Sequence, residues 1–259
     1  MKIGILDSGV GGFSVLREIH ELLPGFPIHY VADSSWCPYG NKPGEIIRER
    51  VSRIADYLLD AGAEILVIAC NSATIHAVGS LRAAYPLPVV GMEPAVKPAA
   101  EWTKSGVVGV LATEASIAGE KFHQLVNTHA RGIRVITKPC PKFVQLVEAG
   151  ILEGQEVDDA VKDAVTPLLD AGADVLVLGC THYPFLRTAI EARVPDHVRL
   201  IDTGPAVAKR TESFLTSSPD LSKEPAEIHI ETTGSLEQLN LLLPKLLPEI
   251  TASTSEAAF

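Results

Sequence analysis

The feature that most constrains this chain is a segment that occurs twice. Residues 58–70 read LLDAGAEILVIAC and residues 168–180 read LLDAGADVLVLGC, with 9 of 13 positions identical at an offset of 110. Each copy predicts a helix end followed by an apolar strand that stops at a cysteine, Cys70 in the first copy and Cys180 in the second. The sequences diverge directly after the two cysteines, which indicates a duplicated scaffold carrying different polar side chains.

Predicted strands and helices alternate along both halves of the chain. Short apolar runs such as 65–69 and 175–179 are typical of parallel strands that are buried on both faces of a sheet. The second half repeats the order of the first, and Glu-Pro-Ala-Val at 93–96 is echoed by Gly-Pro-Ala-Val at 204–207. The pattern therefore predicts an α/β fold with two pseudo-symmetric parallel-sheet domains that face each other across a cleft.

The domain boundaries follow from the duplication. We expect a first α/β domain formed by residues 1–92 together with 207–259, and a second α/β domain formed by residues 93–206. The segment after about residue 208 has no counterpart between the halves, so we expect it to pack back on the first domain. Residues 251–259 are rich in Ser, Thr and Ala, and we expect them to be frayed.

Composition argues against several classes of function. The formal charge of −10, from 22 basic and 32 acidic residues without a basic run, argues against direct binding of nucleic acid. No apolar run approaches the about 20 residues that a membrane-spanning helix needs. The N-terminus also reaches Asp7 too early for a signal peptide, so we expect a cytoplasmic protein without a membrane partner. Four cysteines without a Cys-x-x-Cys pair predict thiols rather than a zinc ribbon or disulfides.

The polar candidates lie where predicted strands end. Ligands of parallel α/β sheets bind beyond the carboxyl ends of the strands, and Asp7, Cys70 and Cys180 all lie at such ends. A single cysteine is often only a small buried hydrophobe. Two cysteines at duplicated strand ends, each followed by hydrogen-bonding residues and a helix start, instead favour two thiols in one cleft. One thiol would take a proton while the other gives one.

The other candidates also have structural interpretations. Asp7 is explained equally well as a turn or helix N-cap residue and as a carboxylate in the cleft that binds an ammonium group or tunes a thiol. His182 is the one histidine that follows a repeated cysteine, and for it we favour a functional role. We expect Cys37 and Cys140, which are flanked by prolines, to be incidental thiols. The remaining positions are explained equally by helix caps at Asn71, Ser72, Thr74 and Thr181, by a turn at Tyr39-Gly40 and by a helix surface at Glu148.

Paired thiols suit one kind of reaction. Inversion of a carbon that bears an acidic hydrogen needs one base on each face of that carbon, and each base must reload as an acid for the reverse direction. A pseudo-symmetric protein with one thiol in each half meets this requirement. The chain contains no dinucleotide-binding fingerprint and no lysine context typical of pyridoxal phosphate, so we expect no cofactor and no metal.

Four motifs carry a resemblance to a known family. They are Ile-Leu-Asp-Ser-Gly-Val-Gly-Gly at 5–12, Pro-Tyr-Gly at 38–40, Ala-Cys-Asn-Ser-Ala-Thr at 69–74 and Gly-Cys-Thr-His-Tyr-Pro at 179–184. In this order and spacing they resemble glutamate racemases of the aspartate/glutamate racemase superfamily, from Lys2 to about Thr211. Ser72 departs from the family, which commonly has threonine there, and Trp36-Cys37 is also atypical.

The resemblance implies conversion of L-glutamate to D-glutamate, for bacterial peptidoglycan, by a cofactor-independent homodimer. It implies that Cys70 and Cys180 are the acid/base residues on opposite faces of the α-carbon, and that Asp7 and His182 assist proton transfer. The positions that match the family's substrate-binding residues are Asp7, Ser8, Tyr39, Gly40, Asn71, Ser72, Thr181 and His182. Thr74 and Glu148 fall near its supporting positions.

Two other functions stay open on the sequence. An aspartate racemase of the same superfamily would use the same pair of thiols on a shorter substrate. A two-lobed small-molecule binding protein would also have facing α/β halves. That function would leave the paired thiols without a role, and we expect no secretion signal in this chain, whereas such binding proteins are usually secreted.

Overall fold

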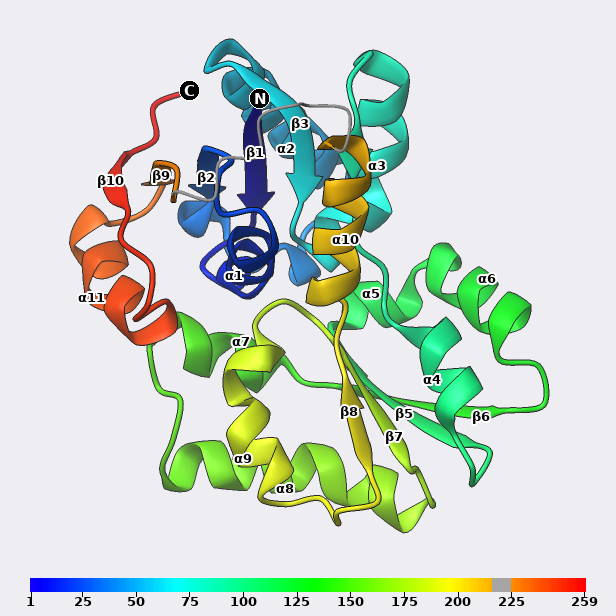
Figure 1. Cartoon of the computed structure of the whole chain (residues 1–259). Coiled ribbons are helices and arrows are strands. Elements are labelled where there is room, and N and C mark those ends of the chain that lie inside the picture. The colour runs from blue at the N-terminus through cyan, green and yellow to red at the C-terminus, as the bar shows by residue number, and fades with distance from the viewer. Residues whose placement is uncertain (216–224) are drawn as a thin grey trace. The chain divides into compact units, whose positions relative to one another are not determined.

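The computed structural model of the chain describes residues 1–215 and 225–259 (Figure 1). The chain splits into two compact units, one from residues 1–92 and 204–259 and the other from residues 93–203. Within the C-terminal segment expected to join the first domain, residues 216–224 lie outside the described residues. Each unit contains one parallel sheet with helices against it, which confirms the predicted α/β class with two parallel-sheet domains.

The sheet of the first unit has six parallel strands in the order β10-β9-β2-β1-β3-β4. Four of these strands come from the N-terminal part of the chain, whereas β9 and β10 come from the C-terminal segment and extend the sheet beyond β2. The strands are β1 (Lys2–Asp7), β2 (Ile28–Ala32), β3 (Ala63–Ile68), β4 (Val89–Val90), β9 (Ile228–Thr232) and β10 (Ser253–Glu256).

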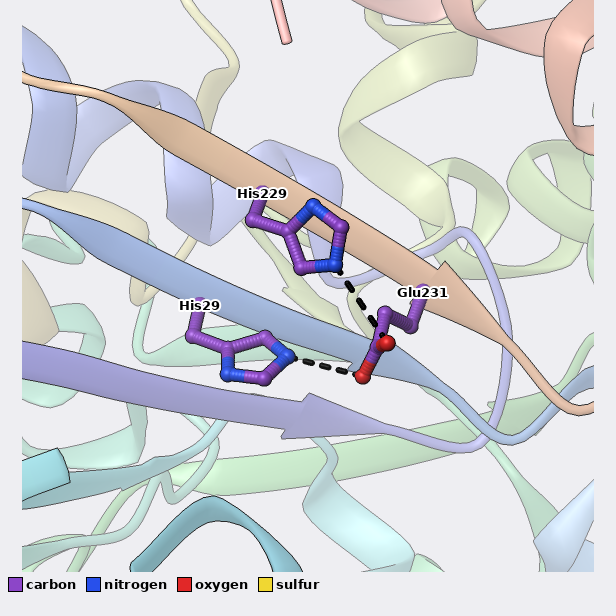
Figure 2. Close-up of side chains that lie close together, drawn as sticks. All are labelled: His29, His229 and Glu231. Carbon is purple, nitrogen blue, oxygen red and sulfur yellow. Dashed lines mark hydrogen bonds and ion pairs between the residues drawn. The ribbon is translucent and has the colours of Figure 1, made fainter. Parts of the chain in front are cut away.

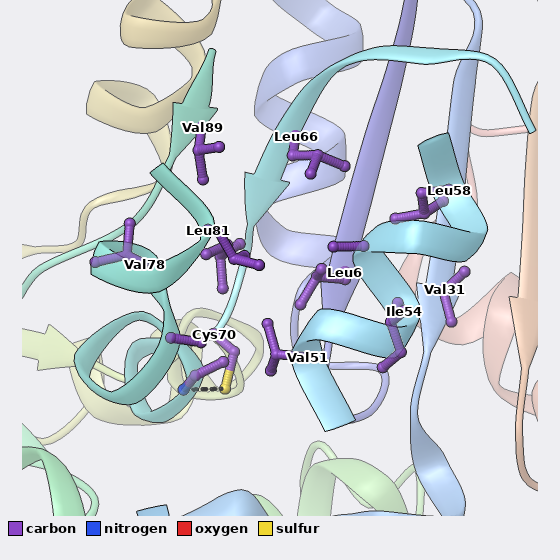
Figure 3. Close-up of a cluster of buried hydrophobic side chains, with 14 of the residues drawn as sticks. Leu6, Val31, Val51, Ile54, Leu58, Leu66, Cys70, Val78, Leu81 and Val89 are labelled. Atoms are coloured by element: carbon purple, nitrogen blue, oxygen red, sulfur yellow. Dashed lines mark hydrogen bonds between the residues drawn. The ribbon is translucent and has the colours of Figure 1, made fainter. Parts of the chain in front are cut away.

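Helices cover both faces of this sheet. Side chains alternate between the two faces along each strand, and each face carries apolar residues that the helices bury. Val31 of β2 joins a buried apolar cluster with Leu58 of α2 and Leu66 of β3, to which α3 also contributes (Figure 3). Tyr30 points the other way and contacts Phe13 of α1, with 4.9 Å between ring centroids, and α10 packs beside α1. The helices are α1 (Phe13–Leu22), α2 (Gly44–Asp60), α3 (Asn71–Ala84), α10 (Gly204–Leu215) and α11 (Leu236–Leu246), with 3-10 turns η1 (Ser34–Trp36) and η2 (Tyr39–Asn41).

The second unit repeats this arrangement on a smaller scale. Its four parallel strands run β6-β5-β7-β8, the same order as β2-β1-β3-β4 in the first sheet. The strands are β5 (Val107–Ala112), β6 (Arg134–Pro139), β7 (Val175–Gly179) and β8 (Arg199–Ile201). The helices are α4 (Val96–Trp102), α5 (Glu114–Ala118), α6 (Glu120–His129), α7 (Pro141–Glu148), α8 (Gln155–Asp170) and α9 (Arg187–Glu191), with the 3-10 turn η3 (Tyr183–Leu186). Across the described parts of both units, every helix is too short or too polar to cross a membrane.

The duplicated segments occupy equivalent places in the two units. Each ends a long helix, α2 or α8, and continues into a central strand, β3 or β7. Gly62 and Gly172 make the turn between helix and strand with φ values of 87° and 89°, in the left-handed region that favours glycine. The sequence repeat is therefore a repeat of structure.

In each unit, a glycine on the strand next to the repeat strand makes room for the equivalent leucine of the repeat. A Cβ placed at Gly4 of β1 would lie 3.3 Å from the Cβ of Leu58, and a Cβ at Gly109 of β5 would lie 3.3 Å from the Cβ of Leu168. Both leucines are almost completely buried, at 0% and 1% exposure. The close approach of helix and sheet thus depends on the glycine and the leucine together.

One expectation about the end of the chain is wrong. Residues 253–256, which we expected to be frayed, form β10 and pair in parallel with β9 from Ser253 to Glu256. Further bonds hold this strand, because the Ser255 hydroxyl donates to Glu231 at 2.9 Å and the Ala257 amide donates to the carbonyl of Thr232 at 2.8 Å. A partner strand supplies the stability that the polar composition of the segment does not predict.

The buried leucine of the second repeat provides a test of this packing. Leu168→Ala should lower the free energy of unfolding by about 2–5 kcal/mol, because it removes buried methyl groups and leaves a cavity beside Gly109. Leu169→Ala, at the adjacent half-buried position, is the matched control and should cost clearly less. Urea unfolding followed by far-ultraviolet circular dichroism measures both, and equal losses would contradict the packing described.

Candidate active site

The first group of candidate residues lies at the carboxyl ends of two neighbouring strands. Since β1 and β3 pair in parallel, Asp7 and Ser8 at the end of β1 come to the same sheet edge as Cys70 after β3. Asp7 is fully buried, and its Oδ2 accepts a hydrogen bond from the amide of Gly12 at 2.7 Å. The Cys70 thiol donates to the hydroxyl oxygen of Ser8, with 3.8 Å between sulfur and oxygen.

Cys70 is also the N-cap of a long helix. Its sulfur accepts a hydrogen bond from the amide of Ala73 at 3.5 Å, at the start of the 14-residue helix α3. The N-terminus of a helix carries partial positive charge from its unpaired amides, and this charge favours a thiolate over a thiol. The local fold therefore supports a sulfur that holds and releases a proton.

The first turn of α3 carries three buried polar residues with different surroundings. Thr74 links elements, because its hydroxyl donates to the carbonyl of Ile68 at 3.3 Å and accepts from the amide of Met92 at 3.1 Å. Ser72 and Asn71 are each 3% exposed. The side-chain amide nitrogen and oxygen of Asn71 are buried and have no hydrogen-bond partner among the described residues. Such a group is rare in a folded protein and suits a side chain that binds a ligand.

Tyr39 belongs to a buried network on the same unit. Its hydroxyl donates to Asp33 at 2.6 Å, and Arg50 holds both carboxylate oxygens of Asp33 at 2.8 Å. Burial, with the neighbouring Asp33 charge, raises the pKa of Tyr39 well above its usual range, so the hydroxyl stays protonated. Tyr39 and Cys70 belong to the same buried cluster of the first unit, which places Tyr39 near the first thiol. Gly40 follows in the turn η2 and is half-buried.

Sequence reasoning passed over Asp33. It is fully buried and also accepts a hydrogen bond from the Thr233 hydroxyl at 2.8 Å, so it connects the loop before α2 to the end of β9. Its position directly after β2 was the available signal, because β2 is a neighbour of β1, which ends in Asp7. A carboxylate at a second strand end of the same sheet is a candidate on that ground alone.

The second group of candidates lies at the end of β7 in the other unit. The sulfur of Cys180 is 3.6 Å from Nδ1 of His182, and Nε2 of His182 is 2.7 Å from Oε1 of Glu148, the last residue of α7. His182 is 2% exposed, and Thr181 between the two is also buried. A carboxylate, an imidazole and a thiol thus form a connected chain, the arrangement in which an oriented base activates a thiol.

The helix expected from Phe185 begins two residues later. The 3-10 turn η3 occupies Tyr183–Leu186, and α9 begins at Arg187. Tyr183, the first residue of the turn, is fully buried and its hydroxyl donates to the carbonyl of Cys140 at 3.0 Å. The two thiols therefore have different environments, a helix N-terminus at Cys70 and an imidazole at Cys180.

Cys140, in contrast, is a buried thiol whose surroundings favour the unreactive protonated form. It is buried, and its Sγ donates to the carbonyl oxygen of Lys138 at 3.4 Å. Burial raises the pKa of Cys140 to about 12, only partly offset by the nearby charge of Lys138. All four cysteines lie in described parts of the chain, and none forms a disulfide.

The structure thus gathers the predicted site residues into two groups. Asp7, Ser8 and Cys70 lie together in the first unit, with Tyr39 near them and Asn71 in the adjoining helix turn. The other group, in the second unit, consists of Cys180, Thr181, His182 and Glu148. Each group contains one thiol with polar partners able to exchange protons or to orient a ligand.

Comparison with known proteins gives one consistent family. The model of the Asp/Glu/hydantoin racemase family matches residues 3–211. The chain is 50% identical over 249 residues to the glutamate racemase of Ectopseudomonas mendocina (strain ymp), which covers 95% of both chains. It is also similar to the crystal structure of Escherichia coli glutamate racemase in complex with L-glutamate and the activator UDP-MurNAc-Ala, at TM-score 0.89 and 32% identity over 99% of this chain and 98% of that one. A Francisella tularensis glutamate racemase in complex with D-glutamate matches at TM-score 0.84 and 27% identity, over 99% and 97% of the two chains.

The raised pKa of Cys140 predicts its reactivity. At pH 8 a thiol with a pKa of about 12 is ionised in only about one molecule in ten thousand, so iodoacetamide should modify Cys140 the most slowly of the four cysteines. The partly exposed Cys37 is the internal reference and should react readily. Peptide mass spectrometry over time measures both rates, and equal rates at Cys37 and Cys140 would contradict the assigned environment.

Proposed function

Because the chain belongs to the Asp/Glu/hydantoin racemase family and, within it, to the glutamate racemases, we propose that it interconverts L-glutamate and D-glutamate without a cofactor. The chain is therefore an isomerase of amino acids. The relatives from Escherichia coli and Francisella tularensis were solved with L-glutamate and D-glutamate, the two partners of this reaction, and they support glutamate as the substrate here.

One observation carries the mechanism. Cys70 follows β3 and Cys180 follows β7, so the two thiols have equivalent places in two sheets of the same strand order. Racemisation at the α-carbon requires a proton acceptor on one face and a proton donor on the other. We propose that the two units present their thiols to opposite faces of the substrate, each thiol serving as base in one direction and as acid in the other.

In the proposed step, one cysteine thiolate removes the α-proton of glutamate and becomes a thiol. The electron pair of the broken C–H bond stays on the substrate as a carbanion next to its carboxylate. The opposite thiol gives its proton to the other face and becomes a thiolate, so charge balances and nothing is oxidised or reduced. The amide at the helix N-terminus beside Cys70 and the imidazole beside Cys180 are the polar groups in contact with the two sulfurs.

The remaining site residues receive supporting roles in this proposal. Asp7 and His182 assist proton transfer beside Cys70 and Cys180, and Glu148 orients the imidazole of His182. Thr74 acts through packing, since both of its hydrogen bonds go to the backbone. The buried, unpartnered amide of Asn71 supports a role in substrate binding. We assign the substrate's carboxylates and ammonium group to Asp7, Ser8, Tyr39, Gly40, Asn71, Ser72, Thr181 and His182.

The cellular role follows from the reaction. D-Glutamate is a building block of bacterial peptidoglycan, and we propose that the chain supplies it in the cytoplasm as a homodimer. The family resemblance of the four sequence motifs supports this role, as does the identity of 50% to a glutamate racemase over 95% of the chain.

Purified protein incubated with L-glutamate alone should drive the circular dichroism signal of the amino acid to zero, because the two enantiomers have equal free energy in water. Cys70→Ala and Cys180→Ala should each lower kcat by about 10²–10⁴-fold, the usual contribution of a general acid or base. Cys140→Ala, at a thiol outside both groups, should stay active.

Three results would contradict these assignments in different ways. A flat trace with L-glutamate would remove the racemase proposal, and faster loss of signal with L-aspartate would favour the aspartate enzyme. Full activity in Cys180→Ala would remove the two-thiol mechanism while leaving the substrate intact. Binding of glutamate without turnover, unaffected by thiol alkylation, would support a binding protein instead.

Glu148 is a positioning residue, and its substitution has a specific expected result. Glu148→Gln keeps the shape of the side chain but removes the charge that holds Nε2 of His182 at 2.7 Å, so kcat should fall by about 10²-fold. KM should change little, because the interaction orients a catalytic group rather than the substrate. Glu153→Gln, at an exposed position nearby in sequence, is the control. A rise in KM with unchanged kcat would contradict this role.

A further inference from the structure

Two histidines and a glutamate lie together on one face of the first sheet, away from the thiols. His29 on β2 and His229 on β9 are register partners, and Glu231 lies two residues further along β9. Because side chains alternate along a strand, all three point to the same face of the sheet. Figure 2 shows both imidazole rings directed at the carboxylate of Glu231.

The distances within this cluster are those of a ligand set. Nε2 of His29 is 2.8 Å from Oε2 of Glu231, and Nε2 of His229 is 3.3 Å from Oε1. The three ligand atoms all lie within 4.8 Å of one another, with ring centroids 5.1 Å apart. Ligand atoms at about 2.0–2.2 Å from a tetrahedral zinc ion are separated by little more than 3 Å, so small side-chain movements suffice to admit an ion.

A supporting contact orients one of the rings. Nδ1 of His229 lies 2.8 Å from the hydroxyl of Ser253 on β10 and donates to it when Nε2 binds a metal. The hydroxyl of Ser255 lies 3.1 Å from Nε2 of His229 and 2.9 Å from Oε1 of Glu231. It is therefore beside two of the atoms that would bind the ion. Metal-binding histidines usually donate their second ring nitrogen to such a partner, which fixes the tautomer and the orientation of the ring.

A cavity of about 310 Å³ gives access to the cluster. Both histidines line it, together with Lys2 at the start of β1 and Ile28 at the start of β2. These residues are at the amino ends of the strands, whereas Asp7 and the thiol of the first unit follow the carboxyl ends. The cluster is therefore separate from the candidate active site and has its own path for a small ion.

We propose that His29, His229 and Glu231 form a binding site for one divalent transition-metal ion of the zinc class. Nε2 of each histidine and one carboxylate oxygen of Glu231 supply three ligands, the donor set typical of zinc with an open fourth position. The hydroxyl of Ser255 or a water molecule from the cavity occupies the fourth position. The ion replaces the Nε2 hydrogens, and each ring then carries its hydrogen on Nδ1.

Such a site joins parts of the sheet that are far apart in the chain. His29 comes from the second strand, and His229 and Glu231 come from the ninth, with Ser253 and Ser255 of the tenth in contact. An ion bound only by the folded sheet raises the temperature of unfolding, and the rise grows with the logarithm of the ion concentration divided by its Kd. The site is structural in this proposal and takes no part in proton transfer at the thiols.

The main experiment measures zinc retained per chain after dialysis against a chelator and then against micromolar Zn²⁺. The wild type should retain one more Zn²⁺ per chain than His229→Gln, and Zn²⁺ should raise its unfolding temperature but not that of the variant. His197→Gln, at an exposed histidine in the second unit, is the matched control and should behave as the wild type. Equal zinc content in the wild type and His229→Gln would overturn the proposal.

A second variant covers the case in which His229→Gln fails to fold. Ser253→Ala leaves all three ligands in place and removes only the partner of Nδ1, so it should weaken Zn²⁺ binding by about 10–100-fold. An unchanged affinity would mean that Zn²⁺ binds away from His229 and would overturn the proposal. Cobalt substituted for zinc identifies the ligands, because a thiolate-to-cobalt absorption band would place the ion at the cysteines and overturn the proposal.

Discussion

Parallel strands that lie side by side end at the same edge of their sheet, and the chemistry of this chain depends on that constraint. In the first unit, pairing of β1 with β3 brings Asp7, Ser8 and Cys70 together across more than sixty residues of sequence. In the second unit, β7 is the central strand that delivers Cys180, and the turn after it brings His182 within reach of Glu148. The glycine-leucine contacts between sheet and helix hold these edges in place.

The two thiols are matched in position but differ in environment. The sulfur of Cys70 accepts a hydrogen bond from the amide of Ala73 at a helix N-terminus. The sulfur of Cys180 contacts the imidazole of His182, which is hydrogen-bonded to the carboxylate of Glu148. Substrate and product of the proposed racemisation are mirror images with equal free energy, so kcat/KM must be the same in both directions. Thiols in two different environments are compatible with that equality.

Much of this architecture is predictable because its signals are local. The apolar runs, the glycine turns and the repeat around Cys70 and Cys180 indicate two parallel-sheet units directly. The failures concern features that depend on distant partners. β10 is polar and pairs along its length with β9, and Asp33 is held by Tyr39, Arg50 and Thr233.

Two other features depend on more than local signals. The helix expected from Phe185 begins at Arg187, because the 3-10 turn η3 comes first. His29 and Glu231 are separated by 202 residues, so no spacing motif connects them. Register between β2 and β9 is what brings them together.

The order of strands in the first sheet also has a consequence for the newly made chain. β2 is complete by Ala32, but β9, which covers its edge, begins only at Ile228. At about 5–20 residues per second, a ribosome needs roughly 10–40 seconds to bridge that gap. The second unit is continuous in sequence and has all its strands well before then. During synthesis, the uncovered edge of β2 is therefore open to pairing with a wrong strand until β9 is made.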